Sequence, residues 1–435
     1  MSIPVVTVGQ SREDVVGGLE RLHGPVTVVR RCAELAELLA ACQSGLARAA
    51  VVADGSEDLT ASLVDRLGAV GVAVIALTDS TDEAARLRGI GVASAVTGVD
   101  SAELADRIAE AVVQLTGGGP RGTHRSAAAD TGAALTPVDG DAGNYPDEPG
   151  PGEIIAVWGP AGAPGRTLLA ANIAGELAAE GKSVLLVDAD SYGASIAAVL
   201  GLVDESAGLA QACRLADQGL LDADALKKVA TPVAIKLGSF RVLTGITRAD
   251  RWTELRASAL ARVLERARQI AEFVVVDTGF CLEADEELSF DTVAPRRNAA
   301  TLRSLELADT VYAVGAADPV GVPRLVRGLA ELESAVPQAV PVVVMNKVRA
   351  SSVGRVPERQ LQDAWARYGP TSELKAFLPH DEAAADAALL GGSLLLEAAP
   401  ESPLRRAIAN LVCAPAQQKS RFSVFSSTAR RKPRD

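Results

Sequence analysis

The chain has 435 residues, of which 48% are hydrophobic and only 3% aromatic, and its formal net charge is −12. This length exceeds what one core usually fills, and its small and branched apolar residues suit helices packed on a parallel sheet, so we expect an α/β protein of two or three domains. The negative charge argues against a protein whose main surface holds DNA, and five cysteines without C-x-x-C spacing argue against a disulfide framework or a zinc site.

The first part of the chain, residues 1–116, alternates strand-like and helix-like segments. We expect strands at 4–9, 25–29, 49–54, 72–78 and 93–98, each followed by a helical pattern. Five such units predict a doubly wound, flavodoxin-like sheet. The arrangement resembles a receiver domain, with Asp54 where a receiver carries its phosphoacceptor.

The rest of a receiver's phosphorylation site is missing from this sequence. Gly9 and Gln10 stand where acidic residues would hold Mg²⁺, and no Lys follows the fifth strand. A lone carboxylate does not assemble the metal that phosphoryl transfer needs. We therefore interpret residues 1–116 as a pseudo-receiver that binds a partner, with phosphorylation of Asp54 as the alternative.

Composition divides the remainder of the chain into three parts. Residues 117–151 are rich in Gly, Pro, Ala and Asp without apolar periodicity, which is typical of a disordered linker. Residues 152–413 form a second α/β pattern, and 414–435 form a basic tail that we expect to be disordered. The tail carries two phenylalanines beside its arginines and lysines, so peripheral contact with an anionic membrane is one interpretation and a solubilising tail is the other.

No segment has the ~18 uninterrupted apolar residues of a membrane span, and the N-terminus lacks the pattern of a signal peptide. We expect a cytoplasmic protein.

A phosphate-loop layout opens the second pattern. The apolar segment 153–158 runs into a Gly/Pro-rich turn that ends in Gly165, Arg166 and Thr167, and an amphipathic helix follows. Backbone N–H groups of such a turn and of the helix N-terminus converge on an anion. The turn departs from G-x-x-x-x-G-K-[ST] at two points: Pro160 stands where the first Gly belongs, and Arg166 replaces the Lys.

Carboxylates follow two further buried strands. Asp188 and Asp190 end the segment 182–190, and Asp277 ends the apolar run at 273–276 in the manner of a Walker B element. Carboxyl ends of parallel strands face the ligand crevice, so we expect these side chains to point toward phosphates and Mg²⁺, with the Thr167 hydroxyl on the same ion.

Two later segments add candidates for a nucleotide base. Asn346 ends the strand-like run PVVVMN, and its amide offers both a donor and an acceptor to an adenine edge. Pro379, His380 and Asp381 precede a helix, where an N-cap is the simpler interpretation of Asp381.

These motifs, VWGPAGAPGRT, VLLVDAD, VVVDTG, VVVMNK and LPHD, resemble the deviant-Walker ATPases of the MinD/ParA superfamily over most of residues 153–413. A receiver-like domain joined to such an ATPase is similar to the CpaE/TadZ family of localisation factors for Flp-type (tight adherence) pilus assembly. The resemblance implies a mainly parallel P-loop NTPase sheet, ATP and Mg²⁺ as ligands, and a homodimer. The implied phosphate and adenine contacts are Gly162, Gly165, Arg166, Thr167, Asp188, Asn346, Pro379 and Asp381. Thr167 and Asp277 would hold Mg²⁺, Asp190 would position the attacking water, and Arg166 would be the remaining catalytic cation.

One departure from this family bears on turnover. Its members usually read K-G-G-x-G-K-T, and Ala161 stands here at the first Lys, so the charge that crosses the dimer interface is absent. Arg is bulkier than Lys and favours bidentate contacts, and loss of one cation at a transferred phosphoryl group costs on the order of 10³-fold in rate. We expect weak or absent ATP hydrolysis. Arg296, Arg297 and Arg303 are candidates for the missing charge, with a solvated helix face as the alternative.

The resulting hypothesis is an ATP-binding localisation factor that contacts pilus-assembly or secretion proteins through residues 1–116, at a cell pole or at the inner face of the membrane. The alternative is an active ParA/MinD-type ATPase that partitions chromosomes or places the division septum.

Overall fold

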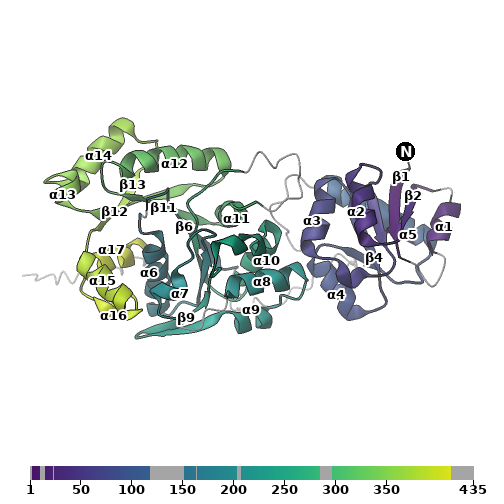
Figure 1. Ribbon diagram of the computed structural model, residues 1–435, viewed down its shortest axis with the longest axis horizontal. Coiled ribbons are helices and arrows are strands. Elements are labelled where there is room, and N and C mark those ends of the chain that lie inside the picture. Colours follow the sequence, from purple (N-terminus) through teal and green to yellow (C-terminus); the bar gives the residue numbers. More distant parts are fainter. Residues whose placement is uncertain are drawn as a thin grey trace, which may run out of the picture.

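The computed structural model describes residues 2–9, 15–22, 24–117, 151–162, 164–202, 207–284 and 296–412. The expected linker, most of it at 118–150, and the basic tail lie outside these residues. The described chain forms two lobes, each built on one sheet: a first lobe up to residue 117 and a second lobe from residue 151 (Figure 1). Among the described residues, no helix is long and apolar enough to cross a bilayer.

The first lobe contains a five-stranded, fully parallel sheet in the order β2-β1-β3-β4-β5. Its strands are β1 (Ile3–Val8), β2 (Val26–Cys32), β3 (Ala49–Val52), β4 (Ala73–Leu77) and β5 (Ala93–Ala95). Its helices are α1 (Val15–Arg21), α2 (Leu35–Gln43), α3 (Ala61–Ala69), α4 (Thr81–Gly89) and α5 (Ser101–Gly117). The flavodoxin-like order predicted from the alternating segments is confirmed.

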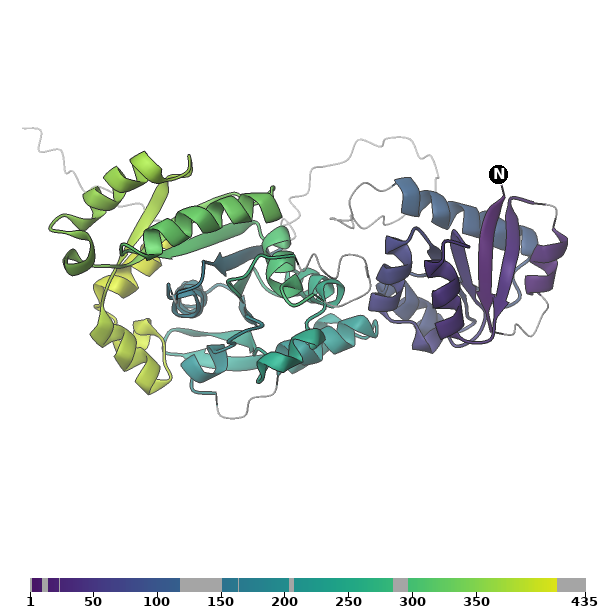
Figure 2. The ribbon, with the colours of Figure 1, turned by 45° about the horizontal axis from the view of Figure 1, so that its top comes forward.

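Alternating side chains of these strands fill two cores. Val6 contributes to the core under α2 and α3, whereas its neighbour Val5 contributes to the core under α1 and α5. Because successive residues of a strand face opposite sides, a short apolar run with helices on both sides buries nearly every residue. Figure 2 shows helices on both sides of the purple strands.

The second lobe contains an eight-stranded sheet in the order β13-β12-β11-β6-β10-β7-β9-β8. Its strands are β6 (Glu153–Trp158), β7 (Val184–Ala189), β8 (Thr231–Ile235), β9 (Gly238–Leu243), β10 (Phe273–Thr278), β11 (Thr310–Ala316), β12 (Pro341–Val348) and β13 (Leu374–Pro379). All pairings are parallel except that of β8 with β9, a hairpin at one edge. The predicted mainly parallel sheet is confirmed.

Helices cover both faces of this sheet. One face packs against α6 (Arg166–Ala179), α15 (Glu382–Gly391), α16 (Leu395–Ala398) and α17 (Pro403–Val412). The other face packs against α8 (Gly208–Asp217), α9 (Ala223–Val229), α10 (Ala257–Ala267), α11 (Ala299–Leu307), α12 (Gly321–Ala335) and α14 (Pro357–Tyr368). Two short helices, α7 (Ile196–Val199) and α13 (Ala350–Val353), complete the lobe.

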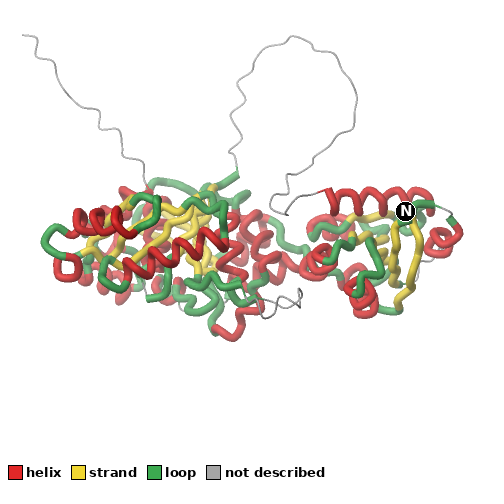
Figure 3. The backbone as a smooth tube through the Cα atoms, turned by 90° about the horizontal axis from the view of Figure 1, so that it is seen from above, coloured by secondary structure: helices red, strands yellow, loops and turns green. Residues whose placement is uncertain are grey.

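The two lobes meet through α3 and α4 of the first and α8 and α10 of the second, and Figure 3 shows the two sheets in yellow on either side of this helical contact. Asp217 accepts hydrogen bonds from the backbone N–H of Ser62 at 2.8 Å and from its hydroxyl. Arg262 pairs with Asp65 at 3.4 Å and donates to the Ile90 carbonyl at 3.3 Å. The contact between the lobes therefore includes polar pairs that join specific donors to specific acceptors.

Candidate functional site

The phosphate-loop layout lies at the centre of the second lobe. β6 is flanked by β10 and β11, and the chain passes from its end at Trp158 through the loop into α6. Gly162 and Gly165 adopt positive φ angles of 112° and 94°. A Cβ added at Gly165 would lie 2.5 Å from Nδ2 of Asn346, so this position requires glycine both for its conformation and for space.

The N-terminus of α6 faces this loop without a side-chain cap. Gly165 occupies the N-cap position and has no side chain that could accept from the first N–H groups of the helix. These N–H groups and the positive end of the helix dipole suit an anion. The α6 helix is 14 residues long and tightly buried, which fixes the direction of these groups.

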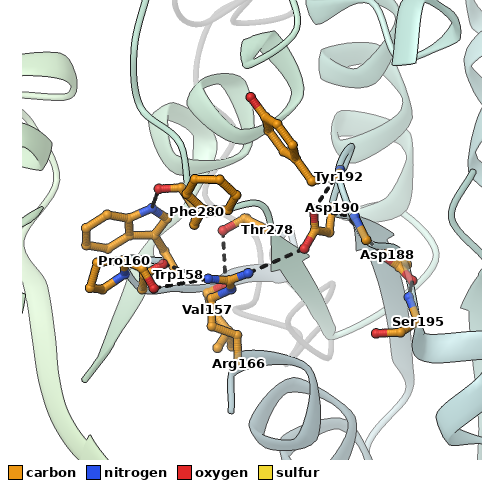
Figure 4. Close-up of polar contacts among 12 residues, drawn as sticks. Val157, Trp158, Pro160, Arg166, Asp188, Asp190, Tyr192, Ser195, Thr278 and Phe280 are labelled. Atoms are coloured by element: carbon orange, nitrogen blue, oxygen red, sulfur yellow. Dashed lines mark hydrogen bonds and ion pairs between the residues drawn. The ribbon is translucent and has the colours of Figure 1, made fainter. Parts of the chain in front are cut away.

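Arg166 lies along the loop and does not project away from it (Figure 4). Its Nη1 donates to the carbonyl oxygen of Gly159 at 2.8 Å, and its Nη2 pairs with Oδ2 of Asp190 at 3.4 Å. The side chain of Arg166 is only 12% exposed. The guanidinium is thus engaged by carbonyl oxygens of the loop and by a carboxylate, which offsets part of its charge.

Asp188 and Asp190 have different surroundings although they leave the same strand. Asp188 is buried and accepts from the backbone N–H groups of Asp190, Ser195 and Ile196 at 2.9–3.3 Å. Burial raises the pKa of Asp188 to about 7, while these hydrogen bonds oppose the shift. Asp188 therefore holds the chain after β7 in place, in addition to any role toward a ligand.

Asp190 holds the next turn of the chain. Its Oδ1 accepts from the backbone N–H groups of Tyr192 at 2.9 Å and Gly193 at 3.1 Å, and its Oδ2 is the partner of Arg166. Both oxygens of Asp190 are therefore engaged within the protein, and a water molecule would have to share them with these donors.

Asp277 is the exception among these carboxylates. It is fully buried, and neither of its oxygens has a hydrogen-bond partner among the described residues. It lies directly beside Asp188 in the register of β10 and β7. Burial, followed by the charge of Asp188, raises the pKa of Asp277 well above its usual value. The nearby Thr167 hydroxyl and the charge of Arg166 oppose this rise in the pKa.

An unpartnered buried carboxylate is costly unless something satisfies it. Asp277 and the Thr167 hydroxyl are oxygen donors of the kind that Mg²⁺ takes, usually together with waters and phosphate oxygens. No three His, Cys, Asp or Glu side chains in the described part of the chain converge on a metal site by themselves. These residues fit an ion that arrives with a phosphate ligand.

The residues predicted to flank adenine lie at the ends of β12 and β13. Asn346 is buried, donates from Nδ2 to the Pro164 carbonyl at 2.7 Å and accepts from the Lys347 N–H at 2.8 Å. Its bond to Pro164 therefore stabilises the conformation of the phosphate loop. Pro379 is the last residue of β13. Asp381 caps α15 through the Ala384 N–H and accepts from the Ser402 hydroxyl at 2.7 Å.

A cluster around Tyr192 links the segments that follow β7 and β10. The Tyr192 hydroxyl donates to Oδ1 of Asn298 at 2.8 Å, and its ring packs against Phe280 with centroids 4.9 Å apart. The guanidinium of Arg297 stacks over the same Tyr192 ring, with its Cζ 4.1 Å from the ring centroid. Of the three arginines suggested as substitutes for the missing charge, Arg297 therefore stacks on an aromatic ring, and Arg303 forms an ion pair with Glu306 at 2.9 Å.

Little in the sequence indicates this cluster. Its one signal is a tyrosine, a residue type that occurs four times in the chain, two positions after Asp190. The contacts of Asn298 reach back to the Glu283 carbonyl at 2.7 Å and to the Cys281 thiol at 3.3 Å, so the cluster fixes both ends of the segment between β10 and α11.

No protein-family model matches the chain, and no curated protein matches it. Solved structures with a similar fold include the cell division ATPase MinD of Pyrococcus furiosus, which is 19% identical with a TM-score of 0.47 over 60% of this chain and 97% of that one. A ParA family ATPase from Chlorobium tepidum is 17% identical with a TM-score of 0.46, covering 60% and 98% of the two chains. MinD of Pyrococcus horikoshii, described in complex with Mg-ADP, is 19% identical with a TM-score of 0.46, covering 60% and 94%. Such similarities concern the fold and say nothing of the reaction.

Proposed function

We propose that this chain binds ATP with Mg²⁺ at the loop between β6 and α6, as a protein of the MinD/ParA type. The observation that carries the proposal is the pairing of an uncapped helix N-terminus, entered through two glycines at positive φ, with the unpartnered buried carboxylate of Asp277. The first element attracts phosphate and the second attracts a cation. A nucleotide bound with Mg²⁺ supplies both at once.

The proposed assignment of residues follows from these positions. Backbone N–H groups of the loop and of the first turn of α6 would contact phosphate oxygens. The Thr167 hydroxyl and the Asp277 carboxylate would hold the ion, which would neutralise phosphate charge. Asn346 would keep the loop in shape through its bond to Pro164.

Slow hydrolysis is part of the proposal. Arg166 is the one cation in the loop sequence 159–167, and its guanidinium is engaged by the Gly159 carbonyl and by Asp190. For Arg166 to reach a transferred phosphoryl group, these contacts would have to break. Asp190 is engaged as well, so neither side chain is poised for catalysis in this conformation. Such a protein would act through its long-lived nucleotide-bound state and not through repeated hydrolysis.

We further propose that the bound state serves localisation, in the manner of a CpaE/TadZ-like factor for pilus assembly or secretion, with a homodimer as the working form. The first lobe supports this role because it has the receiver-like strand order, and Gly9 stands where an acidic residue of a receiver would hold Mg²⁺. Gly9 packs directly against the backbone of Asp54, and a Cβ at Gly9 would lie 2.6 Å from the Asp54 nitrogen. A domain of this kind is suited to binding a partner protein and not to phosphoryl transfer.

Phosphate release by the full-length protein tests this proposal against the cycling alternative. With saturating ATP and Mg²⁺, we expect turnover that stays slow when duplex DNA or anionic lipid vesicles are added. Strong stimulation by DNA would instead indicate a partitioning ATPase, and strong stimulation by vesicles a septum-placing one. Either result would overturn the localisation role while leaving nucleotide binding intact.

A further inference from the structure

The phosphate loop is short of positive charge. A nucleoside triphosphate carries several negative charges, and the loop sequence 159–167 offers only Arg166, whose guanidinium is already paired with Asp190. A bound Mg²⁺ offsets part of the remaining charge. A further cation at the loop would therefore contribute to affinity, most of all for the nucleotide with the larger number of phosphates.

Arg324 is such a cation, and it comes from a different part of the chain. It lies in the first turn of α12, 162 positions after Gly162 in the sequence. A Cβ added at Gly162 would lie only 2.6 Å from Nη1 of Arg324, so the guanidinium rests against the backbone of the loop. Both residues line a small pocket of about 90 Å³, whose other lining residues include Pro160, Ala161, Pro164 and Asp318.

The helix that carries Arg324 is fixed relative to the loop. Asp318 accepts from the backbone N–H groups of Val320 at 2.9 Å and Gly321 at 2.7 Å, which sets the start of α12. One turn beyond Arg324, Gly328 packs so closely on β6 that an added Cβ would lie 3.0 Å from the Trp158 ring and 3.4 Å from Pro160. The position of Arg324 is thus determined by the packing of α12 on the first residues of the loop.

Glycine at position 162 is what makes this contact possible. The residue has a φ of 112°, which disfavours other residues, and any side chain there would displace the guanidinium. Arg324 is exposed, and its guanidinium makes no hydrogen bond or ion pair with the described residues. The guanidinium of Arg166, by contrast, is paired with Asp190 and its side chain is only 12% exposed. Its donors are therefore available to a ligand at the outer side of the loop.

We propose that Arg324 is a nucleotide-positioning residue that donates to the terminal phosphate of bound ATP from within the same chain. This inference rests on the proposed function. It assigns the discrimination between ATP and ADP to α12, a helix that lies outside the phosphate-loop motif. Because the contact is made to the last phosphate, loss of Arg324 weakens ATP binding and leaves ADP binding nearly unchanged.

The test is calorimetric titration of the full-length protein with Mg²⁺ and either ADP or a non-hydrolysable ATP analogue. Arg324→Ala should weaken binding of the analogue by about 10-fold or more, the size expected for a lost hydrogen bond to a charged group, and that of ADP by less than about 2-fold. Arg324→Lys should retain part of the preference. Arg327→Ala is the matched control, because Arg327 is an exposed arginine on the same helix but lines the groove between α12 and α14 and not the loop.

The outcomes separate the inference from the proposed function. If the unmodified protein binds neither nucleotide, the proposed function fails and the inference falls with it. If it binds both and Arg324→Ala leaves the ratio of the two dissociation constants unchanged, the inference alone is overturned. Equal weakening by Arg324→Ala and Arg327→Ala would also overturn it, because that pattern indicates a general effect of surface charge. Unchanged melting temperatures of the variants show that any loss is not one of folding.

Discussion

Replacement of Asp277 by Asn should make the protein more stable while abolishing its use of Mg²⁺. The carboxylate is fully buried, its oxygens have no hydrogen-bond partner among the described residues, and its pKa is raised by burial and by the adjacent Asp188. A buried charged group without a partner costs about 1–3 kcal/mol or more. We therefore expect Asp277→Asn to raise the free energy of unfolding of the second lobe by about 1–3 kcal/mol at pH 8, or roughly 2–4 °C in melting temperature per kcal/mol.

The pH dependence gives the sign of this effect. A carboxyl group whose pKa is raised in the folded state binds its proton more tightly there than in the unfolded chain, where the pKa is near 3.8. The contribution of this protonated carboxyl group to the stability of the folded state is complete below the unfolded pKa and is lost as the pH rises through the folded pKa. The stability advantage of Asp277→Asn should therefore be smallest near pH 4 and grow toward neutral pH.

Thermal and chemical unfolding of both proteins at several pH values measures this advantage. Asp188→Asn is a matched control, because Asp188 is equally buried but accepts three backbone hydrogen bonds, so this change should destabilise the protein. Saturating Mg²⁺ and ATP at 100 times the dissociation constant should stabilise the unmodified protein by about 2.7 kcal/mol and the Asp277 variant much less. A variant that is less stable than the parent at pH 8, by an amount that does not change with pH, would refute the reasoning.

Two further predictions concern turnover and the contact between the lobes. Arg166→Lys should raise ATP turnover at least ~10-fold in a phosphate-release assay, because an ammonium group does not bridge the Gly159 carbonyl and Asp190 as the guanidinium does; an unchanged rate would show that Arg166 does not limit hydrolysis. Arg262→Asp should separate the lobes, because two carboxylates then face each other across the contact. X-ray scattering should show the docked population lowered by roughly 5-fold or more. Adding Asp65→Arg to the same chain should restore docking. Arg266→Asp, on the same helix but bonded to its neighbour Gln269, should leave the scattering unchanged; failure of the double variant to recover would argue against this pair.

The fold could be predicted because its signals are local. Apolar runs of four to six residues that alternate with amphipathic helices define parallel sheets, and both strand orders agree with that expectation. The hairpin of β8 and β9 was not foreseen. β8 lies at the sheet edge, alternates half-buried and exposed residues and carries Pro232, and β9 begins with two exposed residues, so neither strand stands out as a continuous apolar segment.

The candidate site was only partly accessible from the sequence. The glycines, Thr167 and Asp277 follow from motif spacing, and the structure brings them to the carboxyl ends of neighbouring strands. The partners of the polar side chains do not follow from spacing. That Arg166 pairs with Asp190, that Asn346 supports Pro164, and that Arg324 reaches Gly162 depend on packing between segments distant in the sequence.

The central claim, that the loop between β6 and α6 binds ATP with Mg²⁺, is tested most directly by calorimetric titration of the full-length protein and of its Thr167→Ala variant. We expect binding in the micromolar range for the unmodified protein and at least ~10-fold weaker binding for the variant, which loses a hydroxyl ligand of the ion and keeps the loop's backbone. Absence of any binding by the unmodified protein, or equal binding by both, would contradict the claim.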